Sequence, residues 1–428
     1  MAERAQSVLR AQPSATTMNR IAAGAAIVAL AARVEIIHGV TIGFIVCILL
    51  APLWLRVLAK YSGAWTLLIV GLVAIASGLW LTEFSSVDHA VSLSVMLRNS
   101  SLVGEIVFGA GVIMWARTLM SDHSVGLLFG LGLLASVSPS SPLFATNPWK
   151  FGFSVAVTVI VLALAQRIGK RWLEVVLLAA LVVISAVTDG RSSFGIVLIA
   201  LVLVAWQSRP SSLSRPRSAV AIASGGAGLI LAVYALGQAL ILDGYLGEAT
   251  QQRTAEQVNA AGSIIVGGRP EIAATLALMR DSPWGFGSGT QPSLSDILAA
   301  KSGMADINYA PNNGYVERYM FGSQFELHSI AGNLWAAFGL AGIALAAVMI
   351  VLVVRGMSVG IATSAASGLF LFVALKTLWN LPFSPLSSSA PLLILALGLA
   401  MTARGTPTLA DATPRIERSP KRRPRRPV

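Results

Sequence analysis

The sequence has little charge. Only 12% of its 428 residues are Asp, Glu, Lys or Arg and 55% are apolar, whereas about a quarter of a soluble domain is charged. This composition argues against a soluble globular protein. The chain also has a single cysteine, Cys47, which excludes an intramolecular disulfide and a cysteine-based metal cluster. A membrane protein is therefore expected.

The charge that is present is unbalanced. Thirty-one Lys and Arg residues outnumber nineteen Asp and Glu residues, giving a net charge of +12. In a soluble protein such an excess would suggest a nucleic-acid partner. In an apolar chain it is better explained by retention of Lys and Arg on the cytoplasmic side of a membrane, so no nucleic-acid partner is expected. The polar start of the chain contains Arg4, Arg10 and Arg20, which predicts no cleavable signal peptide.

Apolar segments recur along most of the chain, and about twelve of them are long enough to be spanning helices. The sequence thus predicts an all-α polytopic membrane protein. The predicted spans are approximately 21–33, 38–55, 64–81, 99–116, 124–141, 151–166, 172–188, 192–207, 218–242, 328–354, 358–378 and 386–403.

These spans define five regions. We expect a cytoplasmic segment at 1–20, about nine spans in 21–242, a large external loop subdomain at 243–327, about three spans in 328–403 and a basic cytoplasmic tail at 404–428. The tail is rich in Pro and Arg, so it is expected to be disordered and to contact anionic lipids at the cytoplasmic face.

The basic residues predict the orientation. An even number of spans places both termini on the same side, and a cytoplasmic N-terminus makes every internal connection basic. The residues responsible are Arg56, Lys60, Arg117, Arg167, Lys170, Arg171, Arg209, Arg215, Arg217 and Arg355.

The external loop is too long to be a simple connection, because most loops contain only a few residues. Within it, Pro270 to Arg280 has apolar residues at helical spacing (Ile272, Leu276 and Met279), which predicts a short amphipathic helix. The sequence Asp281-Ser-Pro is expected to end this helix.

Three basic side chains on the external side are candidates for chemistry. Arg191 opens a span after a turn of small residues, and Arg269 follows two glycines just before the amphipathic helix, where an arginine and helix N–H groups favour phosphate oxygens. His328 lies where the external loop re-enters the membrane, and histidine is well suited to proton transfer near neutral pH. The alternative interpretations are an Arg191–Asp189 pair that snorkels to the interface and a purely structural histidine.

Three sequence stretches resemble signatures of the O-antigen ligase and O-antigen polymerase superfamily. HSIAGNLWAAFGLAG has the histidine followed by glycines at +11 and +14, at Gly339 and Gly342, where they are expected to permit close helix packing. GRPEIAATLALMRDSPWGFGSG is similar to the superfamily's loop motif, and TDGRSSFGIVLIAL to its arginine motif at the start of a span. The resemblance covers residues 188 to 354 and extends to the earlier spans only as hydropathy.

The resemblance implies a GT-C-like, metal-independent integral-membrane glycosyltransferase without a cofactor. It would transfer a glycan from a polyprenyl diphosphate carrier to an acceptor hydroxyl of a glycan, lipid or protein, on the outer face of the bacterial cytoplasmic (inner) membrane. Arg191 and Arg269 would bind the diphosphate, and His328 would be the general base. This fits the chemistry, because a departing diphosphate needs fixed positive charge and a hydroxyl nucleophile needs a base.

Further residues are reserve candidates. Arg280 is a candidate second diphosphate ligand, Arg318 is a candidate for substrate binding, and Glu326 is a candidate for orienting His328, although residues two apart on a helix face differently. Arg253, Arg280 and Arg318 are equally consistent with solvated positions on the external loop. The sequence departs from the superfamily at Leu334-Trp335, where Tyr-Leu a few residues earlier is more usual, and this puts the acceptor surface in doubt.

Two other functions remain open. A transferase that uses a polyprenyl monophosphate sugar usually has acidic motifs in a large first external loop, but 82–97 is short. A transporter or flippase usually has two similar halves and polar residues at mid-membrane. The sequence shows no convincing repeat, and its clearest mid-span carboxylate is Glu105. The sequence does not distinguish a ligase from a polymerase.

Overall fold

The computed structural model describes residues 15–208 and 269–405, except 189 and 311, together with residues 225, 228 and 252. The predicted ninth span at 218–242 therefore lies almost wholly outside the described residues. The predictions made for Asp189, Arg209, Arg215, Arg217, Arg253, the first fourteen residues and the tail beyond 405 also lie outside them.

The described chain is mostly helical, as predicted. The first half of the described chain contains a small antiparallel hairpin and eleven helical segments. These are α1 (Ala15–Ala32), β1 (Glu35–Ile37), β2 (Val40–Thr41), α2 (Ile42–Leu49), α3 (Ala51–Leu58), α4 (Ala64–Ser85), α5 (Leu93–Arg117), α6 (Asp122–Ala135), α7 (Pro142–Thr146), the π-helix η1 (Trp149–Phe153), α8 (Ser154–Ile168), α9 (Arg171–Val187) and α10 (Arg191–Gln207).

The second half of the described chain contains six further helical segments. These are α14 (Glu271–Asp281), α15 (Leu294–Ala305), the π-helix η3 (Val316–Met320), α16 (Ile330–Ala362), α17 (Gly368–Phe383) and α18 (Leu386–Ala400). The amphipathic helix expected at Pro270 to Arg280 is confirmed as α14. After residue 328, α16 has the length and hydropathy of a membrane span, whereas α17 and α18 are shorter apolar helices. The boundary expected between 354 and 358 is wrong, because α16 continues to Ala362 and α17 begins only at Gly368.

Several helices have the length and hydropathy of membrane spans. Among the described residues, four continuous helical stretches are long and apolar enough to cross a membrane: α4, α5, the η1–α8 stretch and α16. Five shorter apolar helices accompany them, within α1, α6, α10, α17 and α18. The protein is thus an apolar helical membrane protein.

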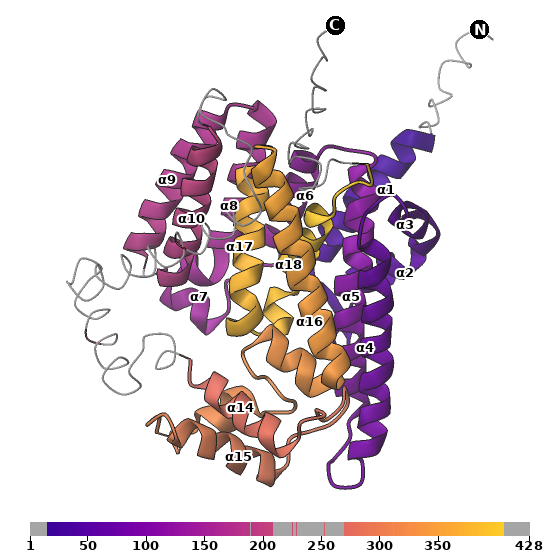
Figure 1. The fold of residues 1–428 in the computed structure, drawn as a ribbon, viewed down its shortest axis with the longest axis vertical. Helices are drawn as coiled ribbons and strands as arrows, with labels where there is room; N and C mark the ends of the chain where they lie inside the picture. The colour runs from indigo at the N-terminus through magenta and orange to yellow at the C-terminus, as the bar shows by residue number, and fades with distance from the viewer. Residues whose placement is uncertain are drawn as a thin grey trace, which may run out of the picture.

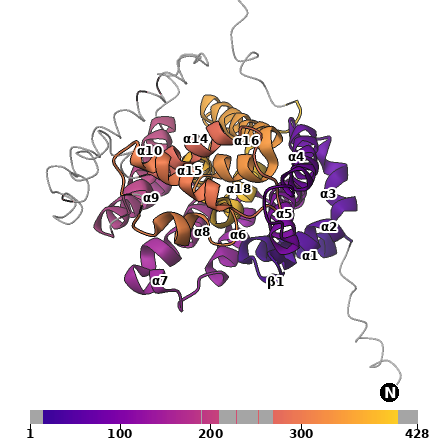
Figure 2. The same cartoon turned by 90° about the horizontal axis from the view of Figure 1, so that it is seen from below.

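The long helices form one bundle, and α14 and α15 lie across one end of it (Figures 1 and 2). We call this the α14 end. α5 begins there, where the Ser92 amide donates to the Gly289 carbonyl. Its last residue, Arg117, donates to the carbonyls of Gly398, in the last turn of α18, and of Met401, just after α18. α5 therefore crosses the whole bundle.

The end opposite α14 is rich in basic residues that bind main-chain carbonyls. Arg171 donates to the carbonyls of Ser364 and Ala366 and to the buried Glu174 carboxylate, which in turn accepts from the Gly368 amide at the start of α17. Cations suit the carbonyl-rich C-terminal ends of helices. Of the connections predicted to be basic, those that contain Arg117 and Arg171 therefore lie at this end, whereas the one with Arg209, Arg215 and Arg217 lies outside the described residues.

Two clusters of buried side chains hold the described parts together. The larger fills the bundle. The smaller lies beneath α14 and α15 and centres on Phe286, which stacks on Phe325 with ring centroids 4.2 Å apart and meets Trp335 edge-on at 5.7 Å. Because Trp335 belongs to α16, the α14–α15 region packs directly on the bundle.

Two predicted spans differ in shape from a simple helix. The span predicted at 38–55 begins in the hairpin and is divided at Leu50 into α2 and α3, with Pro52 in the first turn of α3. α16 is interrupted at Gly339, whose φ of +62° and ψ of −144° are not helical. The prediction that Gly339 permits close packing is therefore incomplete, because this glycine also breaks the helix.

Candidate functional site

His328 lies in the irregular segment between η3 and α16, in a strained conformation. Its φ of +50° is in the left-handed region, which non-glycine residues seldom occupy. Its ring Nδ1 lies 3.1 Å from the carbonyl oxygen of Glu326. A carbonyl only accepts, so Nδ1 carries the hydrogen and, in the neutral ring, Nε2 is left with a lone pair. Strain of this kind is concentrated at functional sites.

The predicted role of Glu326 is corrected in one respect. The main-chain carbonyl of Glu326, rather than its carboxylate, contacts His328, and the carboxylate instead accepts from Gln324 Nε2 at 3.1 Å. The concern about helical spacing does not apply, since neither Glu326 nor His328 is in a helix. Burial raises the pKa of Glu326, while Gln324, His328 and Arg98 act in the opposite direction.

Tyr315 connects His328 to α14. Its ring centroid lies 6.1 Å from that of His328, and its hydroxyl donates to the buried carboxylate of Glu271, the first residue of α14. Burial and the Glu271 carboxylate raise the pKa of Tyr315, and Arg269 acts in the opposite direction. Arg269 is therefore in the same neighbourhood as Tyr315 and His328.

Arg269 also has a cationic neighbour. It is half-buried just before α14, and its charge acts on Lys376 of α17, which is also half-buried. Among the described residues, neither side chain forms an ion pair with a carboxylate. Two adjacent cations without an anionic partner repel each other, so this position favours a bound anion.

The other predicted residues occupy separate positions. Arg191 is the first residue of α10, which begins at the α14 end, close to where Asn147 donates to the Thr188 carbonyl. Arg280 is exposed in the last turn of α14, and Arg318 is exposed in η3. Of the predicted residues, the structure thus brings Arg269, His328 and Glu326 into one neighbourhood.

The interruption of α16 is capped by the loop between α14 and α15. The amides of Phe286 and Gly287 both donate to the Ala336 carbonyl, and Trp335 Nε1 donates to the Pro283 carbonyl. A broken helix leaves carbonyls without partners, and buried carbonyls need them. The Pro-Trp-Gly-Phe-Gly-Ser-Gly loop supplies these donors and so fixes the first turns of α16 behind His328.

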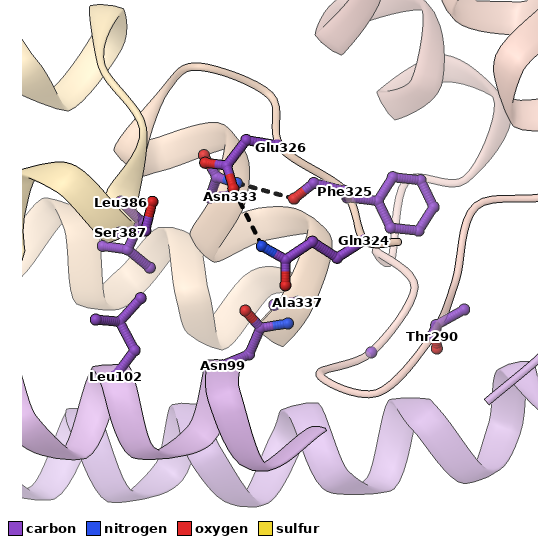
Figure 3. A pocket seen from close by; sticks show the side chains of 11 residues that line it. Asn99, Leu102, Thr290, Gln324, Phe325, Glu326, Asn333, Ala337, Leu386 and Ser387 are labelled. Atoms are coloured by element: carbon purple, nitrogen blue, oxygen red, sulfur yellow. Dashed lines mark hydrogen bonds between the residues drawn. The ribbon is translucent and has the colours of Figure 1, made fainter. Parts of the chain in front are cut away.

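A small polar pocket adjoins Glu326 (Figure 3). Its walls are formed by α5, the 321–329 segment, the first turns of α16, the start of α18 and the loop between α14 and α15. Its lining residues are Asn99, Leu102, Gly287, Thr290, Gln324, Phe325, Glu326, Asn333, Ala337, Leu386 and Ser387.

Sequence patterns did not single out several of these residues. Tyr315, Gln324 and Asn333 carry no sequence signal of their own. Glu105, the clearest mid-span carboxylate in the sequence, accepts from Thr41 Oγ1 at 2.5 Å and lies 3.8 Å from Arg33 Nε, so it has local partners. Within the described ranges, no group of His, Cys, Asp and Glu residues could hold a metal ion.

No protein-family model and no curated protein matches this chain.

Proposed function

We propose that this protein is an integral-membrane glycosyltransferase that transfers a glycan from a polyprenyl diphosphate carrier to an acceptor hydroxyl. The observation that carries the proposal is the geometry of His328. A main-chain carbonyl holds its Nδ1, and its Nε2 is left as a proton acceptor. The neighbouring Tyr315 donates to Glu271 at the start of α14, within range of the charge of Arg269, which has no carboxylate partner among the described residues. A base beside an anion site is what this reaction requires.

In the proposed reaction, His328 Nε2 accepts the proton of the acceptor hydroxyl as its oxygen attacks the anomeric carbon. The bond from that carbon to the diphosphate oxygen breaks, and the diphosphate leaves with the electron pair. Arg269, with Lys376 beside it and Arg191 on the same end of the bundle, stabilises the negative charge on the leaving group. Fixed positive charge is most effective where negative charge develops in the transition state.

The proposal includes a location. About twelve spans would place the α14 end outside the bacterial cytoplasmic membrane, with the basic end and its anionic-lipid contacts inside. Nucleotide sugars are not present outside the cell, and a polyprenyl diphosphate supplies the driving force there. The bundle's basic end, which gathers Arg117 and Arg171, supports this orientation.

The direct test is glycan transfer by the purified protein in lipid nanodiscs, with a polyprenyl diphosphate-linked sugar as donor. His328→Ala is expected to lower the rate by about 10²–10⁴-fold, the usual contribution of a general base. Arg269→Lys is expected to lower it by roughly 10-fold to 100-fold, because charged hydrogen bonds contribute about 1.5–3 kcal/mol and a lysine cannot replace the bidentate arginine.

His123→Ala is the matched control, since His123 is near Ser121 at the basic end, away from the candidate site. It should retain full activity. Transfer should also survive EDTA, as the resemblance implies. Full activity of His328→Ala, or a loss of activity in EDTA that a divalent cation restores, would contradict the proposal.

A deletion strain identifies the acceptor class. Single repeats are expected to accumulate on the carrier if the protein is a polymerase, and full-length chains if it is a ligase.

A further inference from the structure

The pocket beside Glu326 has an excess of hydrogen-bond acceptors. Three buried oxygens in its wall have no hydrogen-bond partner within the described part of the chain: Gln324 Oε1, Glu326 Oε1 and Asn333 Oδ1. The amide nitrogens of Gln324 and Asn333 are already used, since they donate to the Glu326 carboxylate and to the Phe325 carbonyl. Asn333 is only 8% exposed. Buried acceptors without donors are costly, so the pocket is suited to a ligand that donates.

The required donors are uncharged. Glu326 has a cationic side chain within electrostatic range, because Arg98 acts on its carboxylate. A metal cation placed among the three oxygens would be repelled by Arg98. A hydroxyl group donates one hydrogen bond without adding charge, and a sugar presents several hydroxyls together.

The position of the pocket relative to His328 identifies which substrate would bind it. Arg269 and Lys376, the groups suited to the donor diphosphate, do not line the pocket. The 321–329 segment connects the pocket with His328. The Glu326 side chain lines the pocket, and the Glu326 main-chain carbonyl accepts from His328 Nδ1. The acceptor must approach this base with a hydroxyl.

Building on the proposed function, we propose that the pocket binds hydroxyl groups of an uncharged acceptor sugar and orients a neighbouring hydroxyl toward His328. Gln324, Glu326 and Asn333 are its specificity-determining residues. The pocket is small, so it accommodates one part of the sugar and leaves the rest of the acceptor outside. Figure 3 shows these three side chains gathered beside the start of α16.

The experiment compares acceptors that differ by one hydroxyl. The full chain in nanodiscs is given a polyprenyl diphosphate-linked sugar and a panel of methyl glycosides of neutral hexoses and N-acetylhexosamines. The best acceptor is then replaced by each of its monodeoxy derivatives. For the wild-type protein, loss of the hydroxyl that enters the pocket is expected to lower kcat/KM by roughly 10-fold to 100-fold, the effect of leaving a charged partner unpaired.

Glu326→Leu and Gln324→Leu should lower transfer to the parent acceptor and remove this discrimination, so that parent and deoxy acceptors react at similar rates. The KM for the donor should stay unchanged. If Glu326 and Gln324 had only a structural role, their substitution would lower the rates with the parent and the deoxy acceptor alike and leave the ratio of the two rates unchanged. Glu326→Gln keeps the shape of the side chain and replaces one acceptor oxygen with a donor, so it provides the same test should Glu326→Leu fail to fold. Glu317→Gln, an exposed carboxylate that pairs with Lys301, is the matched control and should discriminate as the wild type does.

Three outcomes would overturn the inference. If the pocket variants still transfer glycan and still discriminate between parent and deoxy acceptors as the wild type does, this inference is overturned and the proposed function stands. A requirement for Na⁺ or Ca²⁺ that Glu326→Leu removes would assign the pocket to a cation instead. Absence of transfer to any acceptor by the wild-type protein would overturn the proposed function and this inference together.

Discussion

At Gly339 the requirement for glycine is both conformational and steric. Its φ of +62° is rarely accessible to other residues, and a Cβ atom there would lie 2.4 Å from the Trp284 carbonyl oxygen and 2.7 Å from the Leu81 side chain. Gly339→Ala is therefore expected to destabilise the protein by about 2–5 kcal/mol, from backbone strain and overpacking together. Thermal unfolding in detergent measures this loss.

Gly169→Ala separates the two contributions. Gly169 also has a positive φ, +75°, but a Cβ atom there would meet nothing within 4 Å. Its substitution should cost only the conformational part, about 1 kcal/mol. Equal melting temperatures for the two variants would show that the close contacts at Gly339 are not rigid.

Individual residues were predictable from the sequence to different degrees. Arg269 and His328 were found because each stands in a local pattern, and these two lie in one neighbourhood in the fold. Tyr315 and Asn333 could not be found, because their partners are 44 and 8 residues away and no local pattern records such pairs. The carbonyl contact of Glu326 was also missed, since it depends on the left-handed backbone of His328.

At the scale of elements, a histidine links the α4–α5 connection to α15. His89 Nδ1 lies 2.6 Å from Asp88, and its Nε2 lies 3.0 Å from Asp296, which also caps the start of α15. Burial lowers the pKa of His89, but hydrogen bonds and charges from Asp88 and Asp296 outweigh this effect, so the pKa lies above its usual 6.5. The protonated histidine thus bridges two carboxylates.

Because the folded pKa is raised, this contact is fully stabilising below pH 6.5 and is lost as the pH rises through the raised pKa. Amide hydrogen exchange in α15, corrected for its intrinsic pH dependence, is expected to quicken over that interval. His89→Gln should abolish the change, whereas His123→Gln should preserve it. A pH-dependent acceleration that persists in His89→Gln would assign the effect to another group.

Elements that are long and uniformly apolar were predicted well, and interrupted ones were not. α4 and α5 agree with the expected spans because hydropathy alone determines them. The division at Leu50 and the break in α16 depend on neighbours: the loop amides that bind Ala336 come from residues fifty positions earlier. Hydropathy does not record where a helix receives donors from another segment.

At the scale of the whole molecule, the proposed orientation can be tested with introduced cysteines. Ser86 is exposed at the α14 end, Lys170 is exposed at the basic end, and the native Cys47 is fully buried. In intact cells, a membrane-impermeant maleimide is expected to label Ser86→Cys and not Lys170→Cys. Lysis should expose Lys170→Cys to the reagent.

The unmodified chain is the control and should stay unlabelled throughout. Labelling of Lys170→Cys in intact cells, with Ser86→Cys protected, would reverse the orientation and place the candidate site inside. Such a result would also exclude transfer on the outer face while leaving the fold unchanged.

The contacts that Arg117 and Arg171 make with the last helices have a consequence for the order of synthesis. The carbonyls that these arginines bind, from Ser364 to Met401, are made 193 to 284 residues later in the chain. The helices that carry Arg117 and Arg171 are therefore in the membrane before the carbonyls that these arginines bind have been made. Only when α18 has been inserted can the basic end close, so these contacts form long after the two arginines have been made.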